Sequence, residues 1–121
     1  MNAAERGAAG EEAVSRYLTS RGFRVLARNY HSRYGEIDMI AADAQYILFV
    51  EVKTRSPGSL GTPGEAVDRR KQDKITKTAL QYLAAHKTDL QPRFDVAEVY
   101  ITDSGAQIRY IPNAFSAHSY Y

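Results

Sequence analysis

The chain has 121 residues, of which 44% are hydrophobic, with a formal net charge of +2, so we expect one domain, residues 1–121, with a modest core. The absence of cysteine excludes disulfides, thiolate metal sites and a cysteine nucleophile, and fits a reducing compartment. Because the chain has neither a run of roughly 20 apolar residues nor an apolar secretory signal at its N-terminus, we expect a cytoplasmic protein that makes no membrane contact.

The first two elements follow from the spacing of apolar residues. From about Ala3 to Arg21 such residues recur at intervals of four, which predicts a helix, and Gly22 is suited to ending it. Phe23–Tyr30 alternates between apolar and polar residues and predicts a strand. A turn at residues 32–35 would lead from it into the next segment.

Two short strands are predicted next, Glu36–Ala41 and Tyr46–Val52, and the short link between them indicates an antiparallel hairpin. Since side chains alternate faces along a strand, Glu51 and Lys53 share one face. Opposing positions in such a hairpin come within about 4.5–5.5 Å at Cβ. Asp38 can therefore lie near Glu51, close enough for one cation to bridge the two carboxylates.

The charges of Asp38, Glu51 and Lys53 together suggest a metal-dependent reaction. Two carboxylates suit Mg²⁺, a hard ion that prefers oxygen ligands. Lys53 could orient an attacking water or stabilise charge on a phosphate oxygen, which predicts metal-assisted phosphodiester hydrolysis. An ordinary ion-pair network of Asp38, Glu51 and Lys53 is the alternative. Glu36 is either a further ligand or a solvated residue at the strand end.

The second half of the chain predicts a loop, a helix and two strands. Residues 56–64 contain three glycines and two prolines and form either a cover for substrate or a simple connector. Helical spacing follows over Glu65–His86. Phe94–Ile101 and Gln107–Ile111 then predict a strand pair across a turn. Within it we expect Asp95, which follows Arg93 closely, to be structural rather than catalytic.

The basic residues are distributed unevenly, which matters more than the small net charge. They flank the acidic hairpin on both sides, as a phosphate-backbone substrate would require. A solvated helix face is the alternative for the second group. The residues are Arg21, Arg24, Arg28, His31 and Arg33 before the hairpin, and Lys53, Arg55, Arg69, Arg70, Lys71, Lys74 and Lys77 at its end and after it. Among them we take Arg33, Arg55, Lys71 and Lys74 as candidate nucleic-acid contacts.

The acidic hairpin also carries a resemblance. Asp38, Glu51 and Lys53 resemble the Asp…(Asp/Glu)-x-Lys signature of restriction-endonuclease-like nucleases, a superfamily that includes archaeal Holliday junction resolvases. More closely, the segments GEIDMIA and FVEVKTR resemble the YraN family of small bacterial proteins, in which leucine is commoner than methionine at residue 39. This resemblance extends from Gly10 to Phe115.

The resemblance implies an α/β sandwich with a mixed central sheet of about five strands flanked by helices, in the order helix, three strands, helix, two strands. It implies a Mg²⁺- or Mn²⁺-dependent nuclease in which Asp38, Glu51 and the Val52 carbonyl bind the ion. A first-helix glutamate assists in the resolvases, a role we assign to Glu12, although that residue could instead favour the helix dipole. Lys71 would then contact a substrate phosphate.

Three functions stay open on the sequence alone. The first is a nuclease, with DNA favoured over RNA as substrate. The second is a non-catalytic nucleic-acid-binding module that retains the fold. The third is a protein-interaction factor in which the carboxylates are structural. A homodimer would suit branched or duplex DNA, although no feature of the sequence demands one.

Overall fold

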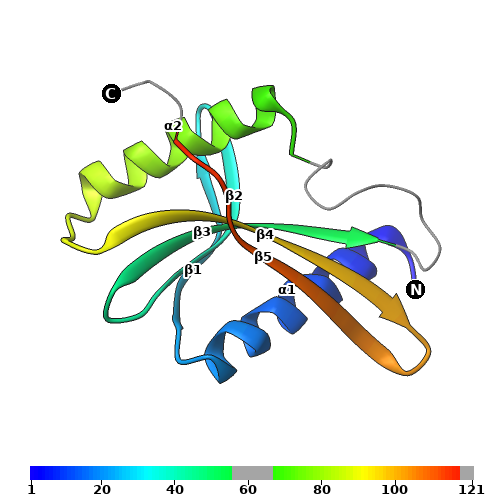
Figure 1. The fold of residues 1–121 in the computed structure, drawn as a ribbon. Helices are drawn as coiled ribbons and strands as arrows, with labels where there is room; N and C mark the ends of the chain where they lie inside the picture. Colours follow the sequence, from blue (N-terminus) through cyan, green and yellow to red (C-terminus); the bar gives the residue numbers. More distant parts are fainter. Residues whose placement is uncertain (56–66, 118–121) are drawn as a thin grey trace.

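The computed structural model describes residues 1–55 and 67–117, over which a pair of helices packs on opposite faces of a five-stranded sheet (Figure 1). The helices are α1 (Ala3–Ser20) and α2 (Arg69–Ala85). The strands are β1 (Arg24–Ser32), β2 (Gly35–Ala42), β3 (Tyr46–Arg55), β4 (Gln91–Thr102) and β5 (Gly105–Phe115). The expected α/β sandwich, its mixed sheet and its order of elements are confirmed. The predicted loop of residues 56–64 lies outside the described residues.

The five strands lie side by side in the order in which they occur in the chain. β1, β2 and β3 form an antiparallel meander, β3 and β4 are parallel, and β4 and β5 are again antiparallel. A parallel pair requires a crossover, and α2 lies between β3 and β4 in the chain. The crossover thus places α2 over one face of the sheet, where its residues can meet those of the meander.

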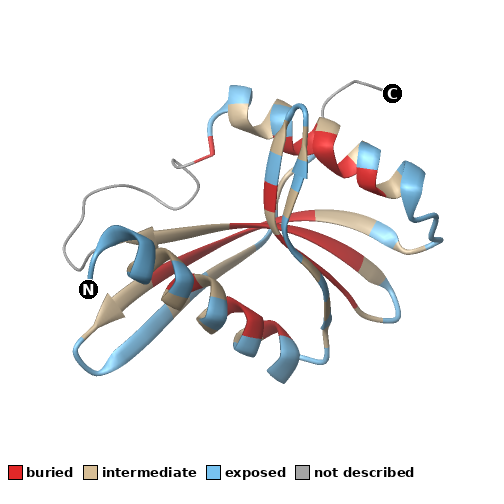
Figure 2. Cartoon of the chain, turned by 180° about the vertical axis from the view of Figure 1, so that it is seen from behind, coloured by how far each residue is buried: buried red, intermediate tan, exposed pale blue. Residues whose placement is uncertain are grey.

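Alternation of side chains along the strands divides the core into two clusters. Figure 2 shows the buried residues in the middle of the sheet and on the helix sides that face it. The α2 side contains Ile37, Ile40, Ile47, Phe49, Val67, Ile75, Ala79, Tyr82, Phe94 and Val96, and the α1 side contains Val14, Leu18, Met39, Ala41, Leu48, Val50, Ala97 and Val99. Since Phe49 faces α2 and Val50 faces α1, the predicted alternation along β3 is confirmed.

Both helix starts have polar caps, and one of them corrects a predicted boundary. The carbonyl oxygen of the Asn2 side chain accepts a hydrogen bond from Glu5 N–H at 2.8 Å, and Asp68 accepts one from Lys71 N–H at 2.9 Å. The second helix was predicted to begin at Glu65, but it begins at Arg69 because Asp68 caps it. Val67, which precedes the cap, is buried in the core on the α2 side.

The end of α1 matches its prediction. Gly22 adopts a φ of 88°, and Phe23 N–H donates to the Leu18 carbonyl at 3.0 Å, which is the pattern of a Schellman motif.

Among the residues that the structure describes, no helix is long and apolar enough to cross a membrane.

β3 and β5 extend further than predicted because their ladders with β4 continue beyond the predicted ends. β3 runs three residues beyond Val52 because its ladder with β4 continues to the pair Arg55↔Tyr100. β5 reaches Phe115 because that residue pairs with Phe94 beyond a bulge in β4. The rings of Phe94 and Phe115 stack with their centroids 5.1 Å apart. Pairing with β4 thus sets both of these ends.

Candidate functional site

The two predicted metal ligands lie where the ladder between β2 and β3 ends. Its described register runs from Ala42↔Ile47 to Met39↔Val50, so the next positions along it are Asp38 and Glu51. There, the Asp38 carboxylate accepts a hydrogen bond from the Val52 backbone N–H at 2.8 Å, taking the place of a strand carbonyl. The hairpin therefore brings the two carboxylates together, as predicted.

The carboxylates of Asp38 and Glu51 share a confined, electrostatically unfavourable environment. Burial, the charge of Glu51, the charge of Glu11 and a hydrogen bond with the Glu51 carboxyl raise the pKa of Asp38 to about 7, against the opposing effect of the Val52 N–H. Glu51 is only 7% exposed. Close to neutral pH Asp38 is thus still partly protonated, because a second full negative charge beside Glu51 is costly.

Lysines from α2 complete a pocket around these carboxylates. Lys71 Nζ lies 2.5 Å from Glu51 Oε1. Burial lowers the pKa of Lys71, but the hydrogen bond and charge of Glu51 outweigh burial and hold it above its ordinary value. The pocket has a volume of about 110 Å³ and is lined by Gly35, Glu36, Asp38, Glu51, Lys71, Lys74 and Ile75. Two candidate phosphate contacts therefore lie in the same pocket as the two candidate metal ligands.

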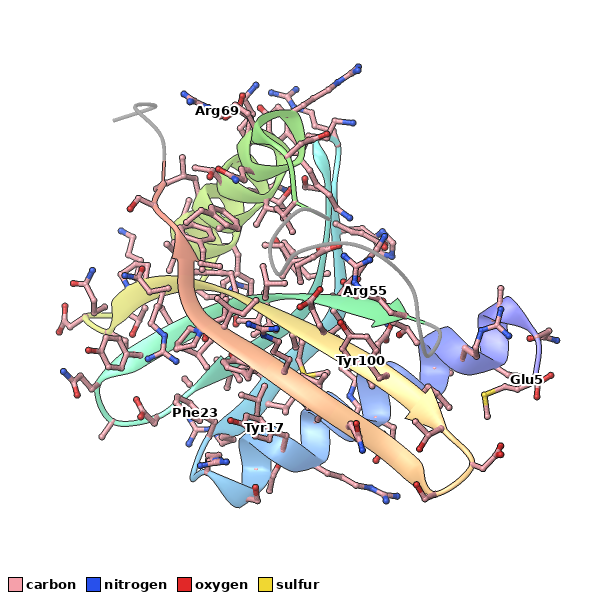
Figure 3. The ribbon with its side chains drawn as sticks, turned by 45° about the vertical axis from the view of Figure 1, so that its right-hand side comes forward. Glu5, Tyr17, Phe23, Arg55, Arg69 and Tyr100 are labelled. Atoms are coloured by element: carbon pink, nitrogen blue, oxygen red, sulfur yellow. The ribbon has the colours of Figure 1, made fainter. Side chains whose placement is uncertain are left out.

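Lys53 and Arg55 follow Glu51 along β3. Because alternate residues share a face, both lie on the α2 side of the sheet with Glu51. Arg55 Nε donates to the carboxylate of Glu98 on β4 at 2.8 Å, and both side chains are largely buried. Figure 3 labels Arg55 at the end of β3 and Arg69 at the start of α2. Arg55 is thus held by a carboxylate that no sequence pattern singled out.

On α1, the carboxylate whose charge acts on the candidate site is Glu11 rather than Glu12. Glu12 is exposed and pairs with Arg28 at 3.1 Å and Arg16 at 3.4 Å, and Arg28 lowers the pKa of this carboxyl. Glu11 is half-buried and is the α1 carboxylate whose charge raises the pKa of Asp38. Its position, three residues before the buried Val14, is the signal that could have identified it.

A close approach between layers fixes the position of Glu11. A Cβ atom added at Gly10 would overlap Thr54 Oγ1 on β3, so the helix backbone rests directly on the strand there. Glu11 also accepts a hydrogen bond from Asn29 Nδ2 at 3.1 Å. Asn29 lies on β1 with a φ of 50°. The glutamate is therefore positioned from both α1 and β1.

The donor set of the pocket fits a hard divalent cation. Asp38 and Glu51 offer carboxylate oxygens, the atoms that Mg²⁺ and Mn²⁺ prefer. Asp38 is still partly protonated near pH 7, and a cation could replace that proton. Among the described residues, no group of three or more His, Cys, Asp or Glu side chains gathers for metal binding. Because Mg²⁺ is usually bound by one or two carboxylates and keeps several waters, an ion held by Asp38 and Glu51 would have coordination positions for water and substrate.

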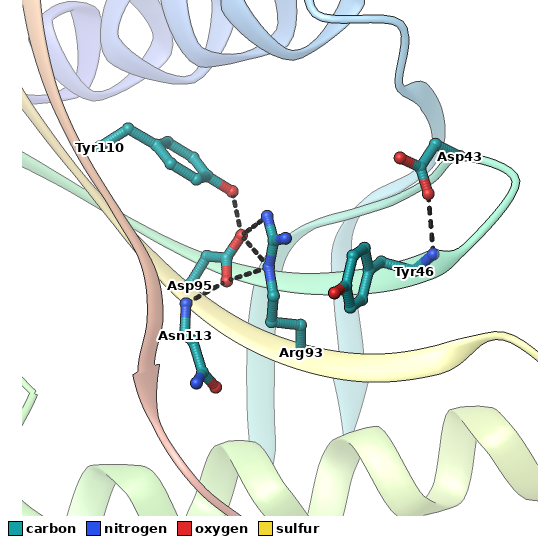
Figure 4. Close-up of polar contacts among 6 residues, drawn as sticks. All are labelled: Asp43, Tyr46, Arg93, Asp95, Tyr110 and Asn113. Carbon is teal, nitrogen blue, oxygen red and sulfur yellow. Dashed lines mark hydrogen bonds and ion pairs between the residues drawn. The ribbon is translucent and has the colours of Figure 1, made fainter.

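A second buried carboxylate, Asp95, belongs to a separate network in which both of its oxygens have hydrogen-bond donors (Figure 4). It accepts hydrogen bonds from Arg93, from the Tyr110 hydroxyl and from the Asn113 backbone N–H. Burial and the charge of Asp95 raise the pKa of Tyr110 well above its ordinary range. The network fastens the bulge of β4 to β5, which agrees with the predicted structural role of Asp95.

Comparison with known proteins gives a family and a distant structural likeness. The model of the uncharacterised protein family UPF0102 matches residues 10–99. The chain is 46% identical to a UPF0102 protein of Alkaliphilus oremlandii, over 90% of this chain and 96% of the relative, and 48% identical to one of Symbiobacterium thermophilum, over 92% and 96%. The structure of Pyrococcus furiosus SfsA in complex with Ca²⁺ is 15% identical with a TM-score of 0.39, and the match covers 92% of this chain and 64% of SfsA.

Proposed function

We propose that this chain, which belongs to the uncharacterised protein family UPF0102, is a Mg²⁺- or Mn²⁺-dependent nuclease that hydrolyses phosphodiester bonds in DNA. The observation that carries the proposal is the pair Asp38 and Glu51, held at the end of the β2–β3 ladder in a pocket lined by Lys71 and Lys74. The structural carboxylate Asp95 is buried with hydrogen-bond donors to both of its oxygens. Asp38 instead has its pKa raised to about 7 by burial and a neighbouring carboxylate, which is typical of functional sites.

The chain's own residues divide the work of hydrolysis. Asp38 and Glu51, with the Val52 carbonyl, would hold the ion, which when bound would supply Lewis-acid polarisation of a phosphoryl oxygen and a lowered pKa for water. Lys53, on the face of Glu51, orients the attacking water. Lys74 and Lys71 neutralise the phosphate, and Lys71 exchanges its contact with Glu51 for one with substrate.

The remaining candidates support binding rather than chemistry. Arg33 and Arg55 would contact phosphates away from the bond that is cut. Glu12, paired with Arg28, would assist only after leaving that pair, whereas Glu11 already acts on Asp38. A homodimer, which would let two scissile phosphates be reached together, and a cytoplasmic location stay predictions.

The test compares cleavage by the wild type and by Glu51→Gln, with Asp103→Asn as an exposed carboxylate control. The substrates are linear duplex, single-stranded, flapped and four-way-junction DNA, together with RNA, each with Mn²⁺, Mg²⁺ or chelator. We expect cleavage that needs metal, is lost in Glu51→Gln and is retained in Asp103→Asn. Cleavage that survives in Glu51→Gln would refute the assignment of the site.

A non-catalytic nucleic-acid-binding module is the second candidate, and the ion pair between Lys71 and Glu51 favours it. At 2.5 Å, the lysine already compensates the carboxylate that would otherwise bind metal. Binding through lysine and arginine should survive chelation. Chelator-insensitive binding by both the wild type and Glu51→Gln, with no cleavage in any metal, would therefore favour this function over the nuclease.

A further inference from the structure

A second pocket is lined by residues at the tip of the β1–β2 hairpin and on α2. The hairpin runs beside α2 there (Figure 1). This pocket has a volume of about 750 Å³, larger than that of the carboxylate pocket and within the range of small-molecule sites. It is lined by Arg33, Tyr34, Lys77, Leu80 and Gln81. Tyr34 is 37% exposed, although most of the large apolar side chains in the described residues are covered.

The lining combines an aromatic ring with two cations. The Arg33 guanidinium lies 5.0 Å from the Tyr34 ring centroid and donates to the Tyr34 hydroxyl at 2.8 Å, while Lys77 Nζ lies 5.7 Å from the same centroid. Leu80 adds an apolar wall and Gln81 an amide that can both donate and accept. Proteins that bind single-stranded nucleic acid use this combination, because bases stack on aromatic rings while cations neutralise the phosphates.

The two pockets are both lined by residues of α2. Lys71, Lys74 and Lys77 are spaced three residues apart, so they follow one another along the side of the helix. A Cβ atom at Gly35 would lie 3.5 Å from Lys74 Cβ, and both residues line the carboxylate pocket. Lys77 is about 9 Å from Lys71 along the helix axis. A base-paired strand, which rises about 3.4 Å per nucleotide, would place two or three nucleotides in this distance, and an extended unpaired strand would place fewer.

We propose that the pocket at Tyr34 binds one unpaired nucleotide within about three positions of the phosphate that is cut in the carboxylate pocket. Its base lies against Tyr34 and Leu80, and its phosphate takes the Arg33 hydrogen bond now made to the Tyr34 hydroxyl. This inference rests on the proposed function, which places the cut at the carboxylate pocket. The substrate would then be DNA with a single-stranded segment beside the cut, because an intact duplex has no unpaired base to offer.

The test measures binding without cleavage, by fluorescence anisotropy in the presence of chelator, with a single-stranded oligonucleotide and a blunt duplex of the same sequence. We expect Tyr34→Ala to weaken single-strand binding by about 5- to 100-fold, the effect of losing one stacked base, and to leave duplex binding unchanged. Tyr34→Phe keeps the ring and should bind as the wild type does. Leu26→Ala, another exposed large apolar residue, is the matched control and should have no effect.

Other outcomes would overturn the proposal. One is that Tyr34→Ala loses affinity equally for the single strand and the duplex. The others are that it loses no affinity, or that the wild-type chain does not bind single strands. Tyr34→Leu serves as a second variant should Tyr34→Ala fail to fold, because it keeps an apolar side chain and should show the same loss. The binding assay contains no metal, so a failure to observe cleavage in the nuclease assay would not contradict binding at Tyr34. Conversely, cleavage that depends on Glu51, together with no effect of the Tyr34 variants on binding, would support the nuclease proposal and refute the nucleotide pocket.

Discussion

Replacing Asp38 with asparagine should stabilise the protein near neutral pH, although the residue is central to the proposed site. The asparagine side-chain oxygen can still accept the hydrogen bond from Val52 N–H. The change removes the negative charge that burial and Glu51 oppose. A site kept for function rather than for stability should respond in this direction.

The pKa of Asp38 sets both the sign and the size of this effect. It rises from 3.8 to about 7 on folding, so the fold favours the protonated form. The stability that protonation contributes is fully present below pH 3.8 and is lost as the pH rises to about 7. A difference of about three pKa units corresponds to an upper bound of about 4 kcal/mol. Because water reaches part of Asp38 and screens its charge, we expect about 1–3 kcal/mol.

The assay is urea unfolding in chelator at pH 4, 6 and 8, comparing wild type with Asp38→Asn and with the exposed control Asp103→Asn. The advantage of Asp38→Asn should be close to zero at pH 4 and should grow to about 1–3 kcal/mol at pH 8. The control should show no pH-dependent gain. Equal stability at all three pH values, or a loss at pH 8, would show that Asp38 is a compensated structural anion and would refute the reasoning.

Two further predictions concern the metal and the packing of α1. In thermal unfolding at pH 7.5, Mn²⁺ at 100 times its Kd should stabilise the wild type by about 2.7 kcal/mol. Glu51→Gln should lose most of this stabilisation. An equal stabilisation of both proteins would show that the ion binds elsewhere. Gly7→Ala should raise stability by about 0.5–1 kcal/mol, since nothing lies within 4 Å of a Cβ atom there. Gly10→Ala should give no such gain because its Cβ would overlap Thr54 Oγ1, and equal urea midpoints for these two variants would contradict that close approach.

The features of the site predicted from sequence are those formed by local geometry. Asp38 and Glu51 belong to neighbouring strands joined by a short turn, so alternation and hairpin pairing were enough to bring them together. The exchange of a ladder hydrogen bond for the Asp38 carboxylate was not visible in the pattern. Neither was Glu98, because its contact with Arg55 depends on the register of β3 against β4, which are distant in sequence.

Other differences arise from contacts between layers. Glu11 and Glu12 are adjacent in the chain, and only the packing of α1 on the sheet distinguishes the half-buried residue from the exposed one. Tyr34 and Lys77 meet because α2 crosses back beside the hairpin, which no local pattern specifies. The start of α2 was placed too early because Asp68, as a cap, outweighs the apolar spacing before it.

The hydrogen bond from Val52 N–H to Asp38 has a consequence for observing the site. Most amides of a sheet interior bond to carbonyls, whose electron density changes little with pH. This one bonds to a carboxylate that titrates at about pH 7. In a nitrogen-15 NMR spectrum, the Val52 cross-peak should therefore move with protonation of the pair or arrival of a cation. A single backbone resonance would report the state of the site without any label on the substrate.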